Sequence, residues 1–212
     1  EVGGDYRIQK YDTKKESYVE CNGSLRMENA NAELTVGGDF YTQSTGANGY
    51  GDSYNYFGAG KLTLKGNFTQ LKGNAKNFQA DGIKVVFAGT NLQEVYFETP
   101  TTSYISNPVY QNTKVCYVGK RRLTMSGSNK VLTVSLPGND NAVSEGLLFA
   151  QDSNPTLDTA GRTRIAFTES SNDEVTFDAA GLEGNTFRAY AIIKDVAGND
   201  QIFYSEPVKI AG

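Results

Sequence analysis

Apolar and polar residues alternate along much of this chain, as at Leu132, Val134 and Leu136, which are separated by threonine and serine. A period of two residues is typical of a half-buried β-strand, and no segment of useful length shows the longer period of an amphipathic helix. The composition agrees with this pattern, because 23 glycines and many threonines, asparagines and tyrosines favour strands joined by tight turns. The sequence therefore predicts an all-β fold.

The pattern repeats itself in the first half of the chain. Residues 60–70, GKLTLKGNFTQ, closely match residues 33–43, ELTVGGDFYTQ. Weaker copies stand at residues 3–9, 84–89 and 123–127. A strand, a glycine-containing corner and an aromatic residue that recur about every 20–40 residues are typical of the coils of a β-solenoid. We therefore predict a β-solenoid-like repeat domain over residues 1–127, with short strands on both sides of the polar turn Asp12–Glu16.

Stacked coils bury the side chains that point inward, because each coil covers its neighbours. The predicted core comprises Leu34, Val36, Phe40, Leu62, Leu64, Phe68, Val85, Phe87, Val95 and Phe97. The side chains predicted to point outward are Thr35, Lys61, Thr63, Lys65 and Lys84. Glycines at the corners are expected to adopt positive φ, which glycine reaches without steric cost. Asp39 and Asn67 follow such glycines, and we expect them to form hydrogen bonds within their turns.

The spacing of strands changes after residue 127. Strands are predicted at residues 130–136, 143–150, 163–168, 174–178, 186–194 and 201–210. Short strands with turn signals about every 8–12 residues are expected of a β-sandwich. The chain is therefore predicted to contain two domains, the second an immunoglobulin-like β-sandwich over residues 128–212.

The repeat segments carry a resemblance. GSLRM, LTVGGDFYTQS and GKLTLKGNFTQ, followed by the run from Asn77 to Val95, resemble a repeat of large secreted or wall-attached proteins of Gram-positive bacteria. This likeness covers residues 3–118, and its motifs are structural, without a catalytic signature. It implies an extracellular or cell-wall-associated location.

A second resemblance lies in the other half of the chain. The segment Arg188–Lys194, followed by Asp195–Asn199, is similar to the last hairpin of fibronectin type III and bacterial immunoglobulin-like modules. It covers residues 130–211 and implies a core or corner position for Tyr190.

Composition excludes several functions. The chain has no histidine, which removes the histidine-based catalytic triads, the usual zinc sites and the commonest general base. The net charge is −4 and Lys120–Arg122 is the longest basic run, so we expect no nucleic-acid partner. The chain has no apolar run long enough for a membrane span, so no membrane insertion is expected. Glu1–Asp5 reads like the middle of a repeat, and we expect a mature or excised part of a longer protein.

No cofactor or metal is predicted. Cys21 and Cys116 are too far apart in sequence for a CxxC motif, and we expect two buried, strand-borne thiols, with a single disulfide as the alternative. Asp195, Asn199 and Asp200 crowd one turn, where calcium is conceivable, but turn geometry explains these residues without a metal.

The segment between the best repeats is long, polar and rich in glycine and aromatic residues. Tyr50, Tyr54, Tyr56 and Phe57 are the candidate ligand-binding residues, because insertions in repeat proteins often lie on the binding face and tyrosine both stacks and hydrogen-bonds. The alternative is that these aromatic side chains fold back and cover an open edge of the coil.

These observations rank the possible functions. We expect a non-catalytic structural or adhesion module of a larger bacterial surface protein, with other domains of that protein and a host or cell-surface protein as partners. The alternative is a carbohydrate-binding module that contacts a glycan through the loop 45–59. A polysaccharide-cleaving enzyme ranks last. It needs two carboxylates about 5–10 Å apart, and Asp39, Asp52 and Asp81 are the only candidates in the repeat domain.

Overall fold

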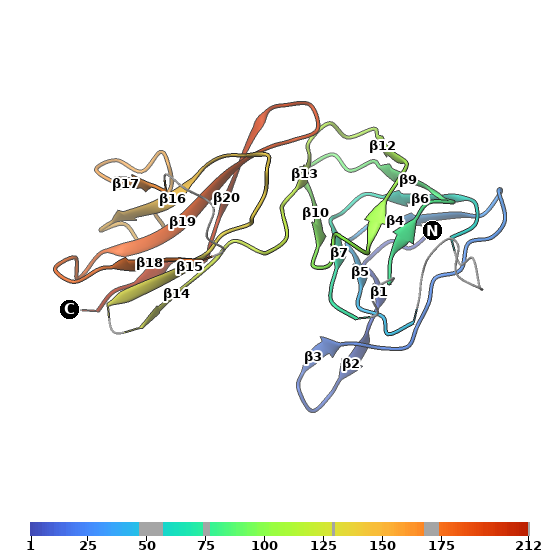
Figure 1. Cartoon of the computed structure of the whole chain (residues 1–212), viewed down its shortest axis with the longest axis horizontal. Helices are drawn as coiled ribbons and strands as arrows, with labels where there is room; N and C mark the ends of the chain where they lie inside the picture. The colour runs from blue at the N-terminus through green and yellow to red at the C-terminus, as the bar shows by residue number, and fades with distance from the viewer. Residues whose placement is uncertain (47–56, 74–76, 129, 168–173, 212) are drawn as a thin grey trace. The chain divides into compact units, whose positions relative to one another are not determined.

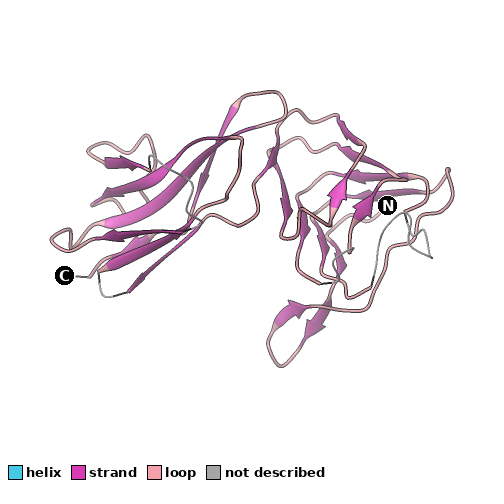
Figure 2. Ribbon diagram, in the orientation of Figure 1, coloured by secondary structure: helices cyan, strands magenta, loops and turns pink. Residues whose placement is uncertain are grey.

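The computed structural model describes residues 1–46, 57–73, 77–128, 130–167 and 174–211, and within these ranges every regular element is a strand (Figures 1 and 2). The all-β prediction is therefore confirmed. The chain divides into two compact units, Glu1–Tyr117 and Val118–Gly212. The division lies after Tyr117 and not after residue 127, because β14 (Thr124–Ser128) pairs with the strand that follows it.

Apart from one antiparallel hairpin, the described strands of the first unit pair in parallel, and the chain adds to the same sheets in turn. One sheet has the order β1-β5-β7-β10-β13 and contains Tyr6–Ile8, Phe40–Thr42, Phe68–Gln70, Gln93–Phe97 and Val115–Tyr117. Another has the order β12-β9-β6-β4 and contains Pro108–Tyr110, Lys84–Phe87, Lys61–Leu64 and Glu33–Val36. A third joins β11 (Tyr104–Ile105) to β8 (Gln79–Ala80). Each circuit through these sheets is one coil, so this unit has the predicted β-solenoid architecture.

The register of the coils aligns equivalent positions of the sequence repeat. Leu34 pairs with Leu62, and Phe40 pairs with Phe68, as the match of ELTVGGDF (residues 33–40) to KLTLKGNF (residues 61–68) requires. The predicted core is confirmed, since all of its members are buried except Leu34, which is half-buried against the core. The rings of Phe40 and Phe68 stack with centroids 5.6 Å apart and planes 14° apart. Packing between coils therefore builds the interior.

The corners between the sheets use glycine for a different reason from the predicted one. Gly38 and Gly66 are not among the residues with positive φ, so that prediction is wrong for them. A side chain on Gly66 would collide with the carbonyl oxygen of Gly38, and one on Gly38 would lie 2.7 Å from the carbonyl carbon of Gly4. Because real Cβ contacts are never so short, the backbone of the preceding coil excludes any side chain at these corners.

The second unit is a sandwich of antiparallel sheets. One sheet has the order β14-β15-β18 and contains Thr124–Ser128, Val131–Ser135 and Glu174–Asp178. The other has the order β17-β16-β19-β20 and contains Thr163–Ala166, Ala142–Ala150, Thr186–Lys194 and Asp200–Tyr204, with β21 (Val208–Lys209) also paired to β19. Leu132 and Val134 of the first sheet share one buried cluster with Leu147 and Phe187 of the second. This arrangement is the predicted immunoglobulin-like sandwich.

The predicted strands of the sandwich match the structure closely, with two corrections. The weak repeat at residues 123–127 is not a solenoid coil, because β14 forms an antiparallel hairpin with β15. The single strand predicted over 201–210 is divided into β20 and β21 around Pro207, which has no backbone N–H for a ladder. Tyr190 is fully buried, as its resemblance implied.

Candidate functional site

A ladder of side-chain acceptors runs along one corner of the solenoid. Asp5 Oδ1 accepts a hydrogen bond from the N–H of Asp39 at 2.9 Å. Asp39 Oδ1 accepts one from the N–H of Asn67 at 2.7 Å, and Asn67 Oδ1 accepts one from the N–H of Glu94 at 2.8 Å. The sequence predicted hydrogen bonds within each turn, whereas these bonds join each coil to the next. The ladder therefore fixes the spacing of the coils.

Beside this ladder, Arg7 lies between two tyrosine rings on the outer side of β1. Its Cζ is 3.6 Å from the ring centroid of Tyr41 and 4.3 Å from that of Tyr18. Arg7 Nη2 donates to Asp5 Oδ2 at 2.7 Å, and the Tyr41 hydroxyl donates to Asp39 Oδ2 at 2.9 Å. Burial and the hydrogen bond to Asp39 raise the pKa of Tyr41. The cation and both rings thus tie the Tyr18 strand to the solenoid.

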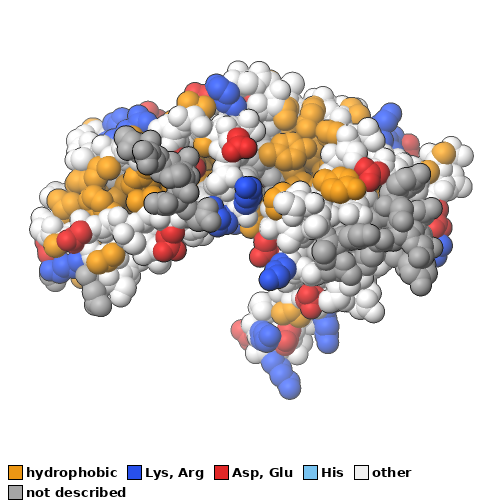
Figure 3. All heavy atoms as spheres, in the orientation of Figure 1, with side chains coloured by type: hydrophobic (Ala, Val, Ile, Leu, Met, Phe, Trp, Pro, Cys, Tyr) orange, Lys and Arg blue, Asp and Glu red, His pale blue; other side chains and the backbone are white. Residues whose placement is uncertain are grey.

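The Tyr18 strand belongs to an exposed hairpin that forms a protrusion of mixed apolar and charged side chains (Figures 1 and 3). It consists of β2 (Lys10–Asp12) and β3 (Ser17–Val19), in which Tyr11 pairs with Tyr18. These side chains are 50% and 48% exposed, with centroids 5.3 Å apart and planes 68° apart. Together with Arg7 they form what we call the hairpin tyrosine surface. Exposed tyrosine offers a ring face for stacking and a hydroxyl for hydrogen bonding.

Sequence reasoning missed this surface, although a signal for it is present. Each tyrosine stands at the centre of a three-residue polar strand beside the Asp12–Glu16 turn. Pairing the two strands across that turn places the tyrosines opposite each other, and directly opposite residues on one face interact.

The predicted ligand-binding loop is only partly covered by the structure. Tyr50, Tyr54 and Tyr56 lie outside the described residues. Phe57 has no exposed surface, and its ring packs against Phe78 with centroids 5.0 Å apart. A ligand cannot stack on a fully buried ring, so Phe57 is a core residue and not a ligand-binding one. For Phe57 the structure matches the alternative in which the aromatic side chain folds back onto the coil.

The candidate carboxylates of the solenoid are engaged in structural contacts. Asp39 belongs to the ladder. Asp81 accepts hydrogen bonds from the hydroxyls of Tyr104, at 2.7 Å, and of Ser106. The bond to Asp81 is the main cause that raises the pKa of Tyr104. Asp52 lies outside the described residues. Within the part of the chain that the structure describes, no group of three or more acidic or cysteine residues could hold a metal ion.

The Asp195 turn satisfies its own carboxylate. Asp195 Oδ1 accepts from the N–H groups of Ala197 and Asn199 at 2.9 Å, and Oδ2 accepts from Gln201 Nε2 at 2.9 Å. These donors hold the pKa of Asp195 below its usual range, although burial opposes them. Asp200 accepts instead from the ammonium of Lys194 at 2.8 Å. Because N–H donors point at the oxygens that a calcium ion would need, hydrogen bonding accounts for this turn.

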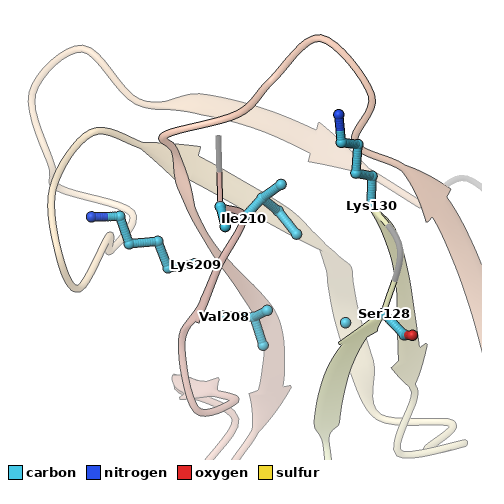
Figure 4. A pocket seen from close by; sticks show the side chains of 7 residues that line it. Ser128, Lys130, Val208, Lys209 and Ile210 are labelled. Atoms are coloured by element: carbon cyan, nitrogen blue, oxygen red, sulfur yellow. The ribbon is translucent and has the colours of Figure 1, made fainter.

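Pockets lie in the sandwich unit. One of about 310 Å³ lies between the β14–β15 hairpin and β21, where Figure 4 shows Val208 and Ile210 between the diverging side chains of Lys130 and Lys209. Lys130 Nζ donates to Glu183 Oε1 at 2.6 Å, which lowers the pKa of Glu183 to about 2. Another, of about 540 Å³, includes one carboxylate, Asp152, among its lining residues. Neither lining therefore brings two carboxylates together.

A buried acid stands in the sandwich. Glu145 of β16 is 4% exposed, and neither of its carboxyl oxygens has a hydrogen-bond partner among the described residues. Burial raises its pKa, because a charged carboxylate is poorly solvated there.

Cys21 and Cys116 are not joined by a disulfide, so the disulfide alternative does not hold in this structure. Cys116 is buried in β13, and Cys21 is half-buried beside Ser44 of the next coil. Among the described residues, no helix is long and apolar enough to cross a membrane.

Comparisons with protein-family models, with curated proteins and with solved structures give no match for this chain. Fold and site therefore define its class: an all-β protein that joins a parallel β-solenoid to an antiparallel sandwich.

Proposed function

We propose that this chain is a non-catalytic structural or adhesion module of a larger extracellular or wall-attached bacterial protein. One observation carries the proposal: Asp39 and Asp81, the described candidate carboxylates of the solenoid, are used to hold the fold. Both oxygens of Asp39 accept hydrogen bonds from the solenoid itself, and both oxygens of Asp81 do the same. A catalytic carboxylate must instead reach a substrate in a pocket.

The architecture supports a spacer role. Successive coils add strands to the same sheets, and neighbouring strands lie about 4.8 Å apart, so a solenoid extends in proportion to its coil number. The resemblances to wall-attached repeats and to fibronectin type III modules agree with a chain that positions other domains. Fold alone does not establish a function, so the proposal needs a direct test.

The test is an incubation of the whole chain with a panel of neutral and acidic polysaccharides. We expect no release of reducing or unsaturated ends over the rate in buffer alone, because Asp39 and Asp81, the described candidate carboxylates of the solenoid, are engaged. Steady release that is proportional to protein concentration would overturn the proposal.

A second candidate function is carbohydrate binding, favoured by the hairpin tyrosine surface. Tyr11 and Tyr18 are half-exposed, and Arg7, which lies over the ring of Tyr18, donates through Nη1 to the amide oxygen of Gln9 at 3.2 Å. Stacking rings beside hydrogen-bonding amides are the groups that hold sugars in shallow sites.

A glycan array separates the two candidate loops. The chain is compared with a Tyr11→Ala/Tyr18→Ala variant, a Tyr50→Ala/Tyr54→Ala/Tyr56→Ala variant and an Ile202→Ala control. Ile202 is an exposed apolar residue of the sandwich. If the hairpin binds sugar, only the first variant loses binding while circular dichroism shows an unchanged fold. Loss in the second variant alone assigns binding to loop 45–59, and absence of any binding removes this candidate.

A further inference from the structure

The first coil ends in a backbone edge that pairs with no other described strand and repeats the residue types of an interior coil. On its outer side, the Arg7 guanidinium lies against Tyr18 of the β2–β3 hairpin. β1 is the terminal strand of its sheet, and Val2 extends the neighbouring sheet by a bridge to Val36. Tyr6 N–H donates to Asp39 O, and Ile8 O accepts from Gln43 N–H. In a parallel ladder alternate residues bond to opposite sides, so the N–H and C=O of Arg7 point away from β5.

The glycines of this coil are the most informative feature. At the same corner of the next coils, Gly37 and Gly38 touch the backbone of Gly3 and Gly4, and Gly66 touches that of Gly38. A Cβ on Gly3 or Gly4 would meet no described atom within 4 Å, and neither residue has positive φ. Nothing within the described chain therefore requires glycine at these two positions.

The side-chain ladders end in the same way. Asp5 Oδ1 accepts a hydrogen bond from the N–H of Asp39, and Asp39 Oδ1 accepts one from the N–H of Asn67. No described side chain accepts a hydrogen bond from the N–H of Asp5. The ring of Tyr6 stacks on Phe40 with centroids 5.4 Å apart and planes 16° apart, which continues the Phe40–Phe68 stack to the edge. All four features therefore end at the first coil: the strand ladder, the glycine corner, the ladder of side-chain acceptors and the stack of aromatic rings.

The geometry points to a further parallel coil as the partner of this edge. The occupant is an extended segment whose corner brings its backbone against Gly3 and Gly4. It presents Asn or Asp to the N–H of Asp5, and its next residue is aromatic and stacks on Tyr6. This coil would form the same hydrogen bonds to the first coil that the described coils form to each other, as in the addition of a strand to a sheet edge. This inference goes beyond the proposed function, because it holds whether or not the module binds a surface.

The test adds one coil to the intact chain. The register Val2–Val36–Leu64–Phe87 makes the residue before Glu1 equivalent to Val85, so a copy of residues 61–85 is joined directly to Glu1. We expect the amide of Arg7 to exchange with solvent about 100-fold more slowly in the extended chain than in the original, since it gains a hydrogen-bond acceptor.

The matched control is the same extended chain with Gly3→Ala and Gly4→Ala. These substitutions occupy open space in the original chain, so its own exchange rates should stay unchanged, but in the extended chain they should abolish the protection of Arg7. An Arg7 amide that exchanges equally fast with and without the added coil would overturn the inference. Equal protection in the alanine variant would also overturn it, because the added segment would then not sit against this corner.

Discussion

Glycines at the solenoid corners and glycines in two turns of the sandwich are needed for different reasons. In the solenoid, Gly38 and Gly66 have no room for a side chain because the preceding coil lies against them. In the sandwich, Gly181 and Gly198 have nothing within 4 Å but adopt φ of 81° and 86°. The first requirement comes from a residue far away in sequence and the second from the local backbone.

Polar side chains differ between the units in the same way. Asn67 and Asp39 of the solenoid bond to residues 27 and 28 positions further along the chain. Asp178 and Asp195 of the sandwich bond to N–H groups two residues away in their own turns. A substitution in the solenoid corner should therefore disturb neighbouring coils, whereas one in a sandwich turn should act locally.

The largest effect that tests this comparison is expected from Phe68→Ala. Phe68 is fully buried, and its ring contacts Phe40, Phe78 and Phe97, which belong to other segments of the solenoid. Removing a buried phenylalanine ring costs about 3–5 kcal/mol of unfolding free energy. Urea unfolding followed by amide exchange should show the loss in the coils on both sides of β7. A loss of protection confined to β7 would contradict the claim that solenoid substitutions disturb the neighbouring coils.

Substituting one glycine in each unit tests the two reasons for glycine separately. Gly66→Ala should cost about 3 kcal/mol, because the backbone of the Gly38 coil must move. Gly181→Ala should cost about 1 kcal/mol, the strain of a left-handed alanine in open space. Urea unfolding, followed separately for each unit, measures both changes in the free energy of unfolding. Equal costs, or a larger cost for Gly181→Ala, would contradict the assignment of the two roles.

A smaller effect is expected from Asn67→Ala, which removes the acceptor of the Glu94 N–H. Leaving a partly buried donor without its acceptor costs about 1–2 kcal/mol. Asn67→Asp is the matched control, since Asp39 performs the same task one coil earlier. Unfolding in urea should show the aspartate variant close to the original chain. If both variants lose the same stability, the ladder bond is not the cause.

In the sandwich, Glu145→Gln should change how the free energy of unfolding depends on pH. Because burial raises the pKa of Glu145, the folded chain keeps a proton that the unfolded chain loses near pH 4.5. Stability should therefore fall as pH rises from about 4.5 through the raised pKa of the folded state, and no penalty remains below that window. At pH 7 the glutamine variant should be more stable by about 1 kcal/mol.

Urea unfolding of both chains at pH 4 and pH 7 measures this effect. The stabilisation by glutamine should appear only at the higher pH. The same difference between the two chains at both pH values would show that Glu145 does not titrate as its burial requires.

Much of the fold could be predicted because local patterns carry it. The match between residues 33–43 and 60–70 predicted the solenoid repeat, and alternation predicted Phe40, Phe68 and the other core residues. The sandwich strands followed from the same alternation and from turn spacing. The strand Thr124–Ser128 was assigned to the wrong unit, because alternation is the same for parallel and antiparallel pairing.

The candidate site was less predictable, because it depends on contacts between distant residues. The composition of loop 45–59 drew attention to Phe57, which the structure buries in the core. The exposed pair Tyr11 and Tyr18 depends on the register of a short hairpin and on the cation of Arg7 beside it. The steric role of Gly66 required the position of another coil, which no local pattern contains.

The central claim is that the corner side chains of the solenoid bind the next coil. Amide hydrogen exchange at Asp39, Asn67 and Glu94 tests it most directly, because each N–H has a side-chain acceptor in the preceding coil. These amides should be protected as strongly as the hydrogen-bonded amides inside the strands β5, β7 and β10. Exchange at the rate of an exposed turn would contradict it.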